Sequence, residues 1–215
     1  IMETQTDRRL RFFTSHGNCL IIGVDELPET RLTAKATNLN SLVQLEKDEE
    51  IVACFDEVKG DTLVFFTALG NAKRTEGKEF DLRTKKTAAI ALKDDDRVIA
   101  VEKQDATAGT VIMVSKGGMS IRFATDTVPV MGKGAGGVKC MKLDEGDRVI
   151  FAAQIADEGE ILTISDRGYA KRSLVFDYEI QGRNGKGLKT FDFKKNGSNG
   201  TAIAAALYVK EPYDI

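Results

Sequence analysis

The chain has 215 residues, of which 42% are hydrophobic and 30% are charged, enough apolar material to bury a core. Its apolar runs, such as Leu20 to Ile22, are far shorter than the roughly 20 residues that span a bilayer, and its first residues lack a signal pattern. The net charge of −2 gives no sign of a nucleic-acid partner. Because the chain begins on Ile1 ahead of a methionine, we expect it to be a piece of a longer protein.

Three cysteines, Cys19, Cys54 and Cys140, are far apart and lie in apolar contexts. An odd count without C-x-x-C spacing argues against a disulfide framework and against a zinc site. We therefore expect buried, reduced thiols.

One element recurs four times along the chain: an apolar run, a Ser or Thr, two further residues and a glycine. It ends at Gly17, Gly70, Gly118 and Gly168, which are 53, 48 and 50 residues apart. Later in each unit an apolar run, a turn and a second apolar run follow, with the turns at 47–50, 93–96, 144–147 and 196–200. The runs are short and rich in Val, Ile, Phe and Thr, so we predict β-strands that form hairpins at these turns. No window shows the apolar spacing of a helix.

Four β-units of about 50 residues are typical of propeller blades, whose neighbours complete each other's core. We predict an all-β fold with about four propeller-like blades of four strands each. All four belong to a single domain, residues 1–215, with approximate repeats 8–60, 61–108, 109–158 and 159–215. The end of the chain soon after the run at 202–209 leaves room for a further blade.

Charge alternates in step with this repeat. The balance is +4 in three segments, with seven basic and three acidic residues in 71–93, five and one in 116–142, and seven and three in 168–195. The segments between them carry −5 in 46–61, −3 in 94–105 and −5 in 143–160. In a ring of blades, equivalent positions fall on one circumference, so the basic segments predict a curved positive band suited to bent duplex DNA. The first repeat has no such segment and is expected to contribute least.

Two loops rich in Gly and Lys occupy equivalent places, at Met131–Gly137 and at Gln181–Gly187. Glycines let backbone N–H groups approach an anion, and Lys133, Arg183 and Lys186 supply charge for a phosphate. The first loop contains G-x-G-x-x-G, but a dinucleotide site requires a helix after it, and the following residues read as a strand. Phosphate of a nucleic-acid backbone is the expected ligand.

The 181–187 loop resembles the box of the DNA gyrase A subunit, whose pattern is Q-R-R-G-G-K-G. Gln181, Arg183, Gly185, Lys186 and Gly187 match, whereas Gly182 and Asn184 depart from the pattern. With the runs at 136–147 and 165–172, the chain resembles the C-terminal domain of a bacterial type IIA topoisomerase A subunit over nearly its whole length. The resemblance implies a β-pinwheel, a propeller-like ring with strands exchanged between blades, that bends DNA around a basic rim.

In gyrase the intact box lies in the first blade, where it supports chiral DNA wrapping. Here the first repeat lacks the loop, and the degenerate match lies in the last. This pattern favours the A subunit of topoisomerase IV, which selects and positions DNA segments, over the gyrase A subunit.

The basic segments and the two loops together supply the predicted DNA-binding residues: Lys73, Arg74, Arg83, Lys85, Lys86, Arg122, Lys133, Lys139, Lys171, Arg172, Gln181, Arg183, Gly185, Lys186, Gly187 and Lys189. The resemblance implies three partners in the bacterial cytoplasm at the nucleoid, which are double-stranded DNA, the B subunit, and the rest of the A subunit. No membrane, cofactor, metal or small-molecule substrate is expected for this domain.

Catalysis is expected to lie outside this chain, although the resemblance implies that the parent is an ATP-dependent enzyme. DNA cleavage in that class needs a Tyr beside an Arg, and none of the tyrosines at 169, 178, 208 and 213 directly follows an Arg. His16 has no nucleophile nearby, and Asp94–Asp96 lacks EF-hand spacing. The alternatives are a propeller that binds an acidic protein partner and, less favoured, an enzyme with a site in its central channel.

Overall fold

A computed structural model describes residues 2–93 and 95–210. In these residues the strands are β1 (Arg9–Thr14), β2 (Asn18–Gly23), β3 (Ile51–Phe55), β4 (Thr62–Thr67), β5 (Asn71–Glu76), β6 (Lys86–Ala88), β7 (Val98–Lys103), β8 (Thr110–Ser115), β9 (Met119–Ala124), β10 (Val138–Lys139), β11 (Val149–Ile155), β12 (Glu160–Ser165), β13 (Ala170–Leu174), β14 (Leu188–Lys189) and β15 (Ile203–Val209). Five short 3-10 helices accompany them: η1 (Val24–Glu26), η2 (Leu39–Ser41), η3 (Gly77–Phe80), η4 (Thr125–Thr127) and η5 (Val175–Asp177). The all-β prediction is confirmed.

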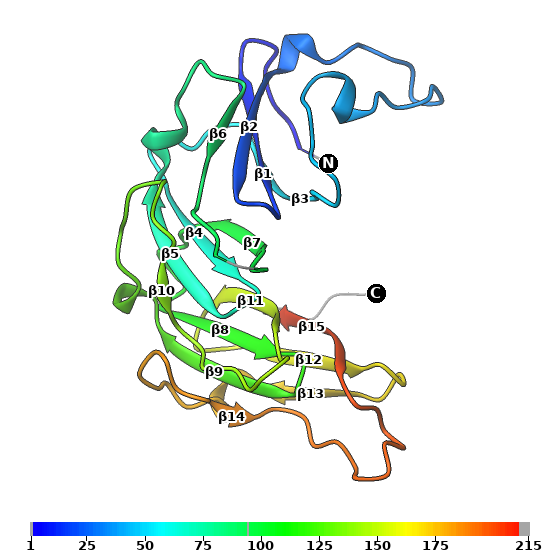
Figure 1. The fold of residues 1–215 in the computed structure, drawn as a ribbon, viewed down its shortest axis with the longest axis vertical. Helices are drawn as coiled ribbons and strands as arrows, with labels where there is room; N and C mark the ends of the chain where they lie inside the picture. Colours follow the sequence, from blue (N-terminus) through cyan, green and yellow to red (C-terminus); the bar gives the residue numbers. More distant parts are fainter. Residues whose placement is uncertain (1, 94, 211–215) are drawn as a thin grey trace.

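The strands form four antiparallel sheets that correspond to the four predicted blades. Their orders are β3-β1-β2-β6, β10-β5-β4-β7, β11-β8-β9-β14 and β13-β12-β15. Figure 1 shows the blades in an open arc, with β3, β7, β11 and β15 on the concave side and β6, β10 and β14 toward the convex side. The first three blades have four strands, and the fourth has three within the described part of the chain.

Strands are exchanged between neighbouring blades, as the resemblance implied. The outer strand of each of the first three blades comes from the following repeat, so β6 pairs with β2, β10 with β5 and β14 with β9. The predicted hairpins at the turns 93–96, 144–147 and 196–200 are therefore wrong. The strands before and after each of these turns lie in different sheets. The sequence could not predict this, because the alternation of apolar residues does not specify which sheet a strand joins.

The first repeat shows what happens to the exchanged segment without a preceding blade. The predicted strand at 42–45 is not formed, since no described sheet edge is available to it. Instead Val43 is buried against Leu20 and Ile22 of its own blade, with Leu42 and Leu45 beside it. The apolar pattern of this segment was read correctly, but its pairing partner decides whether it becomes a strand.

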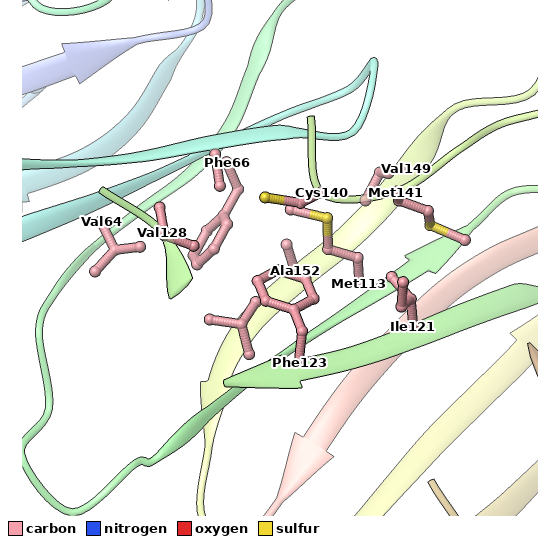
Figure 2. Close-up of a cluster of buried hydrophobic side chains, with 12 residues drawn as sticks. Val64, Phe66, Met113, Ile121, Phe123, Val128, Cys140, Met141, Val149 and Ala152 are labelled. Carbon is pink, nitrogen blue, oxygen red and sulfur yellow. The ribbon is translucent and has the colours of Figure 1, made fainter. Parts of the chain in front are cut away.

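Apart from the cluster around Val43 in the first blade, the hydrophobic core lies between neighbouring blades. Figure 2 shows one cluster, in which Val64 and Phe66 of β4 face Met113 of β8 and Phe123 of β9. Cys140, which follows the exchanged strand β10, completes this cluster and is fully buried. Burying each of the Val, Phe and Met side chains of this cluster contributes roughly 1.5–3 kcal/mol. A second cluster joins the first two blades through edge-to-face rings, with the centre of Phe13 5.1 Å from that of Phe80. Each blade therefore depends on its neighbour for stability.

Candidate nucleic-acid interface

The exchanged strands and the loops before them form the outer edge of the arc, which we call the outer rim: β6, β10, β14 and the loops 131–137 and 181–187. Backbone hydrogen bonds join the rim of one blade to that of the next. Asn184 N donates to Cys140 O at 2.7 Å, and Lys142 N donates to Gly185 O at 2.9 Å. One blade earlier, Ala91 N donates to Ala135 O at 3.3 Å. The rim is thus one continuous surface across the first three blades.

The 181–187 loop explains how the two departures from the box pattern are tolerated. Asn184 stands where the pattern has glycine and has φ +66°, a left-handed conformation that Asn accepts more readily than most residues. At Gly182, where the pattern has arginine, a Cβ would meet nothing within 4 Å. Gly187 is required, because it has φ +77° and a Cβ there would overlap the Ser120 carbonyl oxygen. The loop backbone therefore suits the gyrase pattern despite both changes.

Arg183 ties this loop to the neighbouring blade by donating Nη1 to Lys139 O at 3.1 Å. Lys186 is exposed and pairs with Asp144 at 2.5 Å. Gln181 donates its backbone N–H to Arg122 O at 2.7 Å, which starts the loop at the edge of β9. Lys142, which is not among the predicted DNA-binding residues, is exposed and adjoins the loop through its backbone N–H. Its basic character alone does not distinguish it from other lysines.

Most of the predicted DNA-binding residues reach the surface. Those that are exposed are Arg83, Lys85, Lys86, Lys139, Lys171, Arg172, Lys186 and Lys189. Those that are half-buried are Arg74, Lys133, Gln181, Arg183, Gly185 and Gly187. Lys171 and Arg172 lie on β13, an edge strand of the fourth blade among the described residues. All the others except Arg74 lie on or beside the outer rim.

Two predicted DNA-binding residues, Lys73 and Arg122, are buried and cannot reach a phosphate in this structure. The Lys73 ammonium binds the carbonyl oxygens of Gly132 and Lys133. The Arg122 guanidinium pairs with Asp157 at 2.5 Å and donates Nε to Thr110 Oγ1 at 2.9 Å. Both residues are corrections to the predicted set, because a count of charge along the sequence does not reveal which side chains point inward.

Arg122 makes hydrogen bonds to the next blade, and an equivalent arginine does the same in the second blade. Its Nη1 donates to Val175 O and Tyr178 O, at both ends of the 3-10 turn of the next blade. Arg74, the equivalent residue of the second blade, donates Nε to Val128 O at 2.6 Å in the third. These equivalent arginines join successive blades and so serve the fold rather than the rim.

In the first blade the corresponding arginine lies on β1, the strand paired with β2. Ile21 occupies the equivalent position on β2. Its cross-strand partner Arg11 donates to Phe80 O of the second unit and to Asp56 O at the end of its own. In the fourth blade Arg172 has no following blade among the described residues and pairs with Glu160 at 3.3 Å.

Several rim lysines already pair with exposed carboxylates. Lys85 lies 2.6 Å from Glu26, and Lys86 lies 3.1 Å from Glu46. The hydrogen bond from each lysine lowers the pKa of its carboxyl partner. Exposed ion pairs of this kind stabilise little, so a phosphate can replace the carboxylate. Both carboxylates come from the first repeat, which was expected to contribute least to DNA binding, whereas the lysines of the first blade come from the second repeat.

The acidic turns hold the ends of the β-hairpins. Asp96 accepts a hydrogen bond from Leu69 N at 2.8 Å and from Asn71 Nδ2 at 3.1 Å. In the first repeat Glu49 accepts from Thr14 Oγ1 and Asn18 Nδ2. Asp147 likewise accepts from Gly117 N. These carboxylates therefore have structural partners.

One group, His16, Glu46 and Glu49, has the composition of a metal site, with ligand atoms within 4.8 Å of one another. The Lys86 ammonium already lies 3.1 Å from Glu46 and 3.9 Å from Glu49. Glu49 also has three donors of its own, so a cation would have to displace established partners. The group fits a lysine better than a metal ion.

The described tyrosines have structural partners or lie on the surface. Tyr178 OH hydrogen-bonds Thr190 Oγ1 at 2.7 Å in the core, and Tyr208 OH donates to Glu158 O at 2.9 Å. Tyr169 is exposed. Tyr213 and Asp94, both named above with the candidate catalytic and cation-binding groups, lie outside the described residues.

Burial raises the pKa of the Cys19 thiol to about 12 and that of the Cys140 thiol to about 11.

Among the described residues, none of the helices has the length and apolar character of a membrane span.

The fold and the rim together define a β-pinwheel: an open array of blades that exchange strands and carry basic, glycine-rich loops on the outer edge. A family model for the "DNA gyrase C-terminal domain, beta-propeller" matches residues 12–55, 61–105, 109–156 and 159–199, one segment for each blade. The chain belongs to this family. The predicted relationship to the C-terminal domain of a type IIA topoisomerase A subunit is thereby confirmed.

Curated relatives and solved structures agree with this assignment. The chain is 34% identical over 210 residues to the DNA gyrase A subunit of Haloquadratum walsbyi, and 34% identical over 211 residues to that of Escherichia coli K12. These alignments cover 93% and 95% of this chain and 24% of each relative, so the chain spans about a quarter of their length.

Among solved structures, a topoisomerase IV C-terminal domain aligns with a TM-score of 0.90 at 27% identity, covering 97% of this chain and 65% of that one. A gyrase A C-terminal domain aligns with a TM-score of 0.74 at 25% identity, covering 96% and 67%. The relatives in sequence are thus gyrase subunits, and the solved structures include both enzymes.

Proposed function

We propose that this chain binds duplex DNA along its outer rim and bends it around the arc. The observation that carries the proposal is the continuity of the rim: hydrogen bonds join the loops of successive blades, and Lys139, Arg183 and Lys186 lie together where two blades meet. Convex curvature with phosphate-binding charge suits a bent duplex. Phosphate contacts do not require particular bases, so affinity should depend little on the base sequence of the DNA.

The acidic turns support the same path for DNA. Asp96 and Asp147 bind hairpin ends rather than rim lysines. Asp144 and Glu46 instead make exposed ion pairs with Lys186 and Lys86, which a phosphate can replace. A phosphate backbone that left the rim toward these turns would meet like charge. The charge pattern therefore favours a path around the edge of the blades.

The test is duplex DNA binding measured across a salt series. The logarithm of affinity should fall linearly with the logarithm of salt concentration, by about 0.9 for each phosphate neutralised. Replacing Arg183 and Lys186 with glutamate should weaken binding and reduce bending, measured by energy transfer between the duplex ends. The matched control is the same change at Lys59 and Lys103, two lysines away from the rim that pair with Asp81 and Asp61.

Affinity that does not change between 50 and 200 mM salt would contradict binding through the rim. A chain that forms no stable complex with any duplex, and that captures an acidic protein instead, would favour the protein-interaction alternative.

We further propose that DNA is presented in this way to the cleavage core of a type II topoisomerase in the bacterial cytoplasm. The protein partners there would be the B subunit together with the rest of the A subunit. Family membership supports this role. The catalytic groups and any cofactor would then lie in the other parts of that enzyme.

The choice between gyrase-like wrapping and topoisomerase IV-like positioning stays a prediction. The degenerate box in the last repeat supports positioning. Sealing a nicked plasmid in the presence of the chain tests it, because chiral wrapping leaves a change of linking number of one sign, whereas positioning leaves little.

A further inference from the structure

Lys73 is a fully buried lysine. It lies in the middle of β5, and its cross-strand partner is Phe65. The equivalent positions in the first and third blades are Leu20 and Ile121, which pair with Phe12 and Met113. An apolar residue therefore satisfies this position in the core, and burying an ammonium there costs free energy unless it is bound.

The ammonium of Lys73 fills the inside of the 131–137 loop. Its Nζ donates to Gly132 O at 3.1 Å and to Lys133 O at 2.9 Å, and it lies 5.2 Å from the centre of the Phe65 ring. The two ends of the loop bind β5 on either side of it, through Met131 N to Arg74 O at 2.7 Å and through the pair Val138 and Ala72. The loop therefore leaves and rejoins the strand around the Lys73 side chain.

Glu79 holds the same loop from the other side. Its carboxylate, on η3, accepts a hydrogen bond from Lys133 N at 2.8 Å. The backbone of Lys133 is thus fixed at both polar groups, its N–H by Glu79 and its C=O by Lys73. The 181–187 loop has no such clamp: Ile121 lies beneath it, 3.4 Å from where a Cβ of Gly185 would stand.

We propose that Lys73 is a positioning residue for DNA binding, which together with Glu79 fixes the backbone of the 131–137 loop so that the Lys133 ammonium faces a DNA phosphate. The proposal rests on the proposed function of the outer rim. A buried residue of the second blade thus fixes the conformation of a loop that belongs to the third repeat.

The pH dependence of DNA binding should report on this clamp. Burial lowers the pKa of Lys73 to about 8, and the nearby Glu79 carboxylate opposes that shift. The other charged groups around the loop are Lys133 itself and the Lys93, Asp96 and Lys139 side chains, which line a pocket with Gly136 and Gly137. Cys19 of β2 is also near, and its thiol stays neutral because burial raises its pKa to about 12. The charged form of Lys73 binds the loop, so DNA affinity should fall as the pH rises from 7 through 9.

The test compares salt slopes of DNA binding for the Lys73→Met, Lys133→Ala and double variants of the chain. Loss of one phosphate contact should lower the slope by about 0.9 in Lys133→Ala, and Lys73→Met should lower it by the same amount. The double variant should equal either single one, and the fall of affinity between pH 7 and 9 should disappear in Lys73→Met. The control Lys59→Met, at an exposed lysine away from the loop, should keep the original slope.

Glu79→Ala provides a second variant, which leaves Lys73 and the core residues around it unchanged. Removing a carboxylate from a DNA-binding protein ordinarily strengthens binding, because like-charge repulsion is lost. Here it should weaken binding, because the Lys133 N–H loses its acceptor.

A Lys73→Met slope equal to the original, losses that add in the double variant, or stronger binding by Glu79→Ala would each overturn the positioning role. If the Arg183 and Lys186 double variant still weakens binding in that case, the rim function stands and only this inference fails. If the unmodified chain shows no salt-dependent binding, the proposed function itself fails.

Discussion

Arg122 offers a direct test of how the blades are held together, through the change Arg122→Met. The side chain is 5% exposed and donates to Thr110 Oγ1, to Val175 O and Tyr178 O at 3.4 Å, and to the carboxylate of Asp157. Methionine fills much of the same space, so the main loss is the set of hydrogen bonds from a charged donor. Such bonds contribute about 1.5–3 kcal/mol each at most, and buried acceptors left without a donor add to the cost.

The ion pair itself should contribute little to this loss. Asp157 is 90% exposed and regains water when its partner is removed. We therefore expect a loss of about 2–4 kcal/mol in the free energy of unfolding, toward the lower end of the roughly 3–5 kcal/mol that breaking a fully buried pair costs.

The assay is urea unfolding followed by circular dichroism, with amide hydrogen exchange to locate the loss. Exchange should accelerate in the fourth blade, where the carbonyl partners lie. The matched control is Arg172→Met, the equivalent residue of the fourth blade, which is 68% exposed and pairs with Glu160. It should change stability by no more than about 0.5 kcal/mol. A cost below about 1 kcal/mol for Arg122→Met, or equal costs for the two variants, would refute the assignment of Arg122 as an inter-blade contact.

Two further predictions concern a buried carboxyl and a loop glycine. Burial raises the pKa of Glu102, which accepts two hydrogen bonds from Gln154, so the folded state binds a proton more tightly than the unfolded state and stability falls as the pH rises through the interval between the two pKa values. Glu102→Gln should therefore be at least as stable as the original chain at pH 7 in urea unfolding, and a large loss there would show that the ionised carboxylate is needed. Gly187→Ala should cost more than about 1 kcal/mol, because of its positive φ and the overlap with Ser120 O, whereas Gly182→Ala should be nearly neutral. Similar melting temperatures for the two glycine variants would contradict this account of the loop.

The repeat in the sequence predicted much of the architecture. Four glycine-terminated elements marked four β-hairpins, β1–β2, β4–β5, β8–β9 and β12–β13, all of which the structure contains. Positive φ at Gly17, Gly70, Gly118 and Gly168 gives the physical reason, since each hairpin turn needs a residue that adopts this conformation. Sequence reasoning also placed the 131–137 and 181–187 loops at equivalent positions.

The pairing of the exchanged strands could not be derived from alternation alone. The sequence predicts strands at Val138 and Leu188. The alternation of apolar residues is the same whether such a strand pairs with its own blade or with the blade before it. In the structure these two residues pair with Ala72 and Ser120 of the blade before. The glycine ahead of each strand permits the close approach, since a Cβ at Gly137 would lie 2.6 Å from Ala72 O. The resemblance to a known family suggested the exchange, and the structure establishes it.

By itself the sequence determined the number of blades, the periodic charge and the chemistry of the loops, because these follow from local composition repeated at a fixed interval. Only the tertiary structure decided which basic residues face the solvent. Lys73 and Lys171 occupy equivalent positions, as do Arg122 and Arg172, yet the first of each pair is buried and the second is exposed. The difference arises because a following blade covers the first of each pair, whereas no described blade covers β13, so the same residue type serves the fold in one blade and the surface in another.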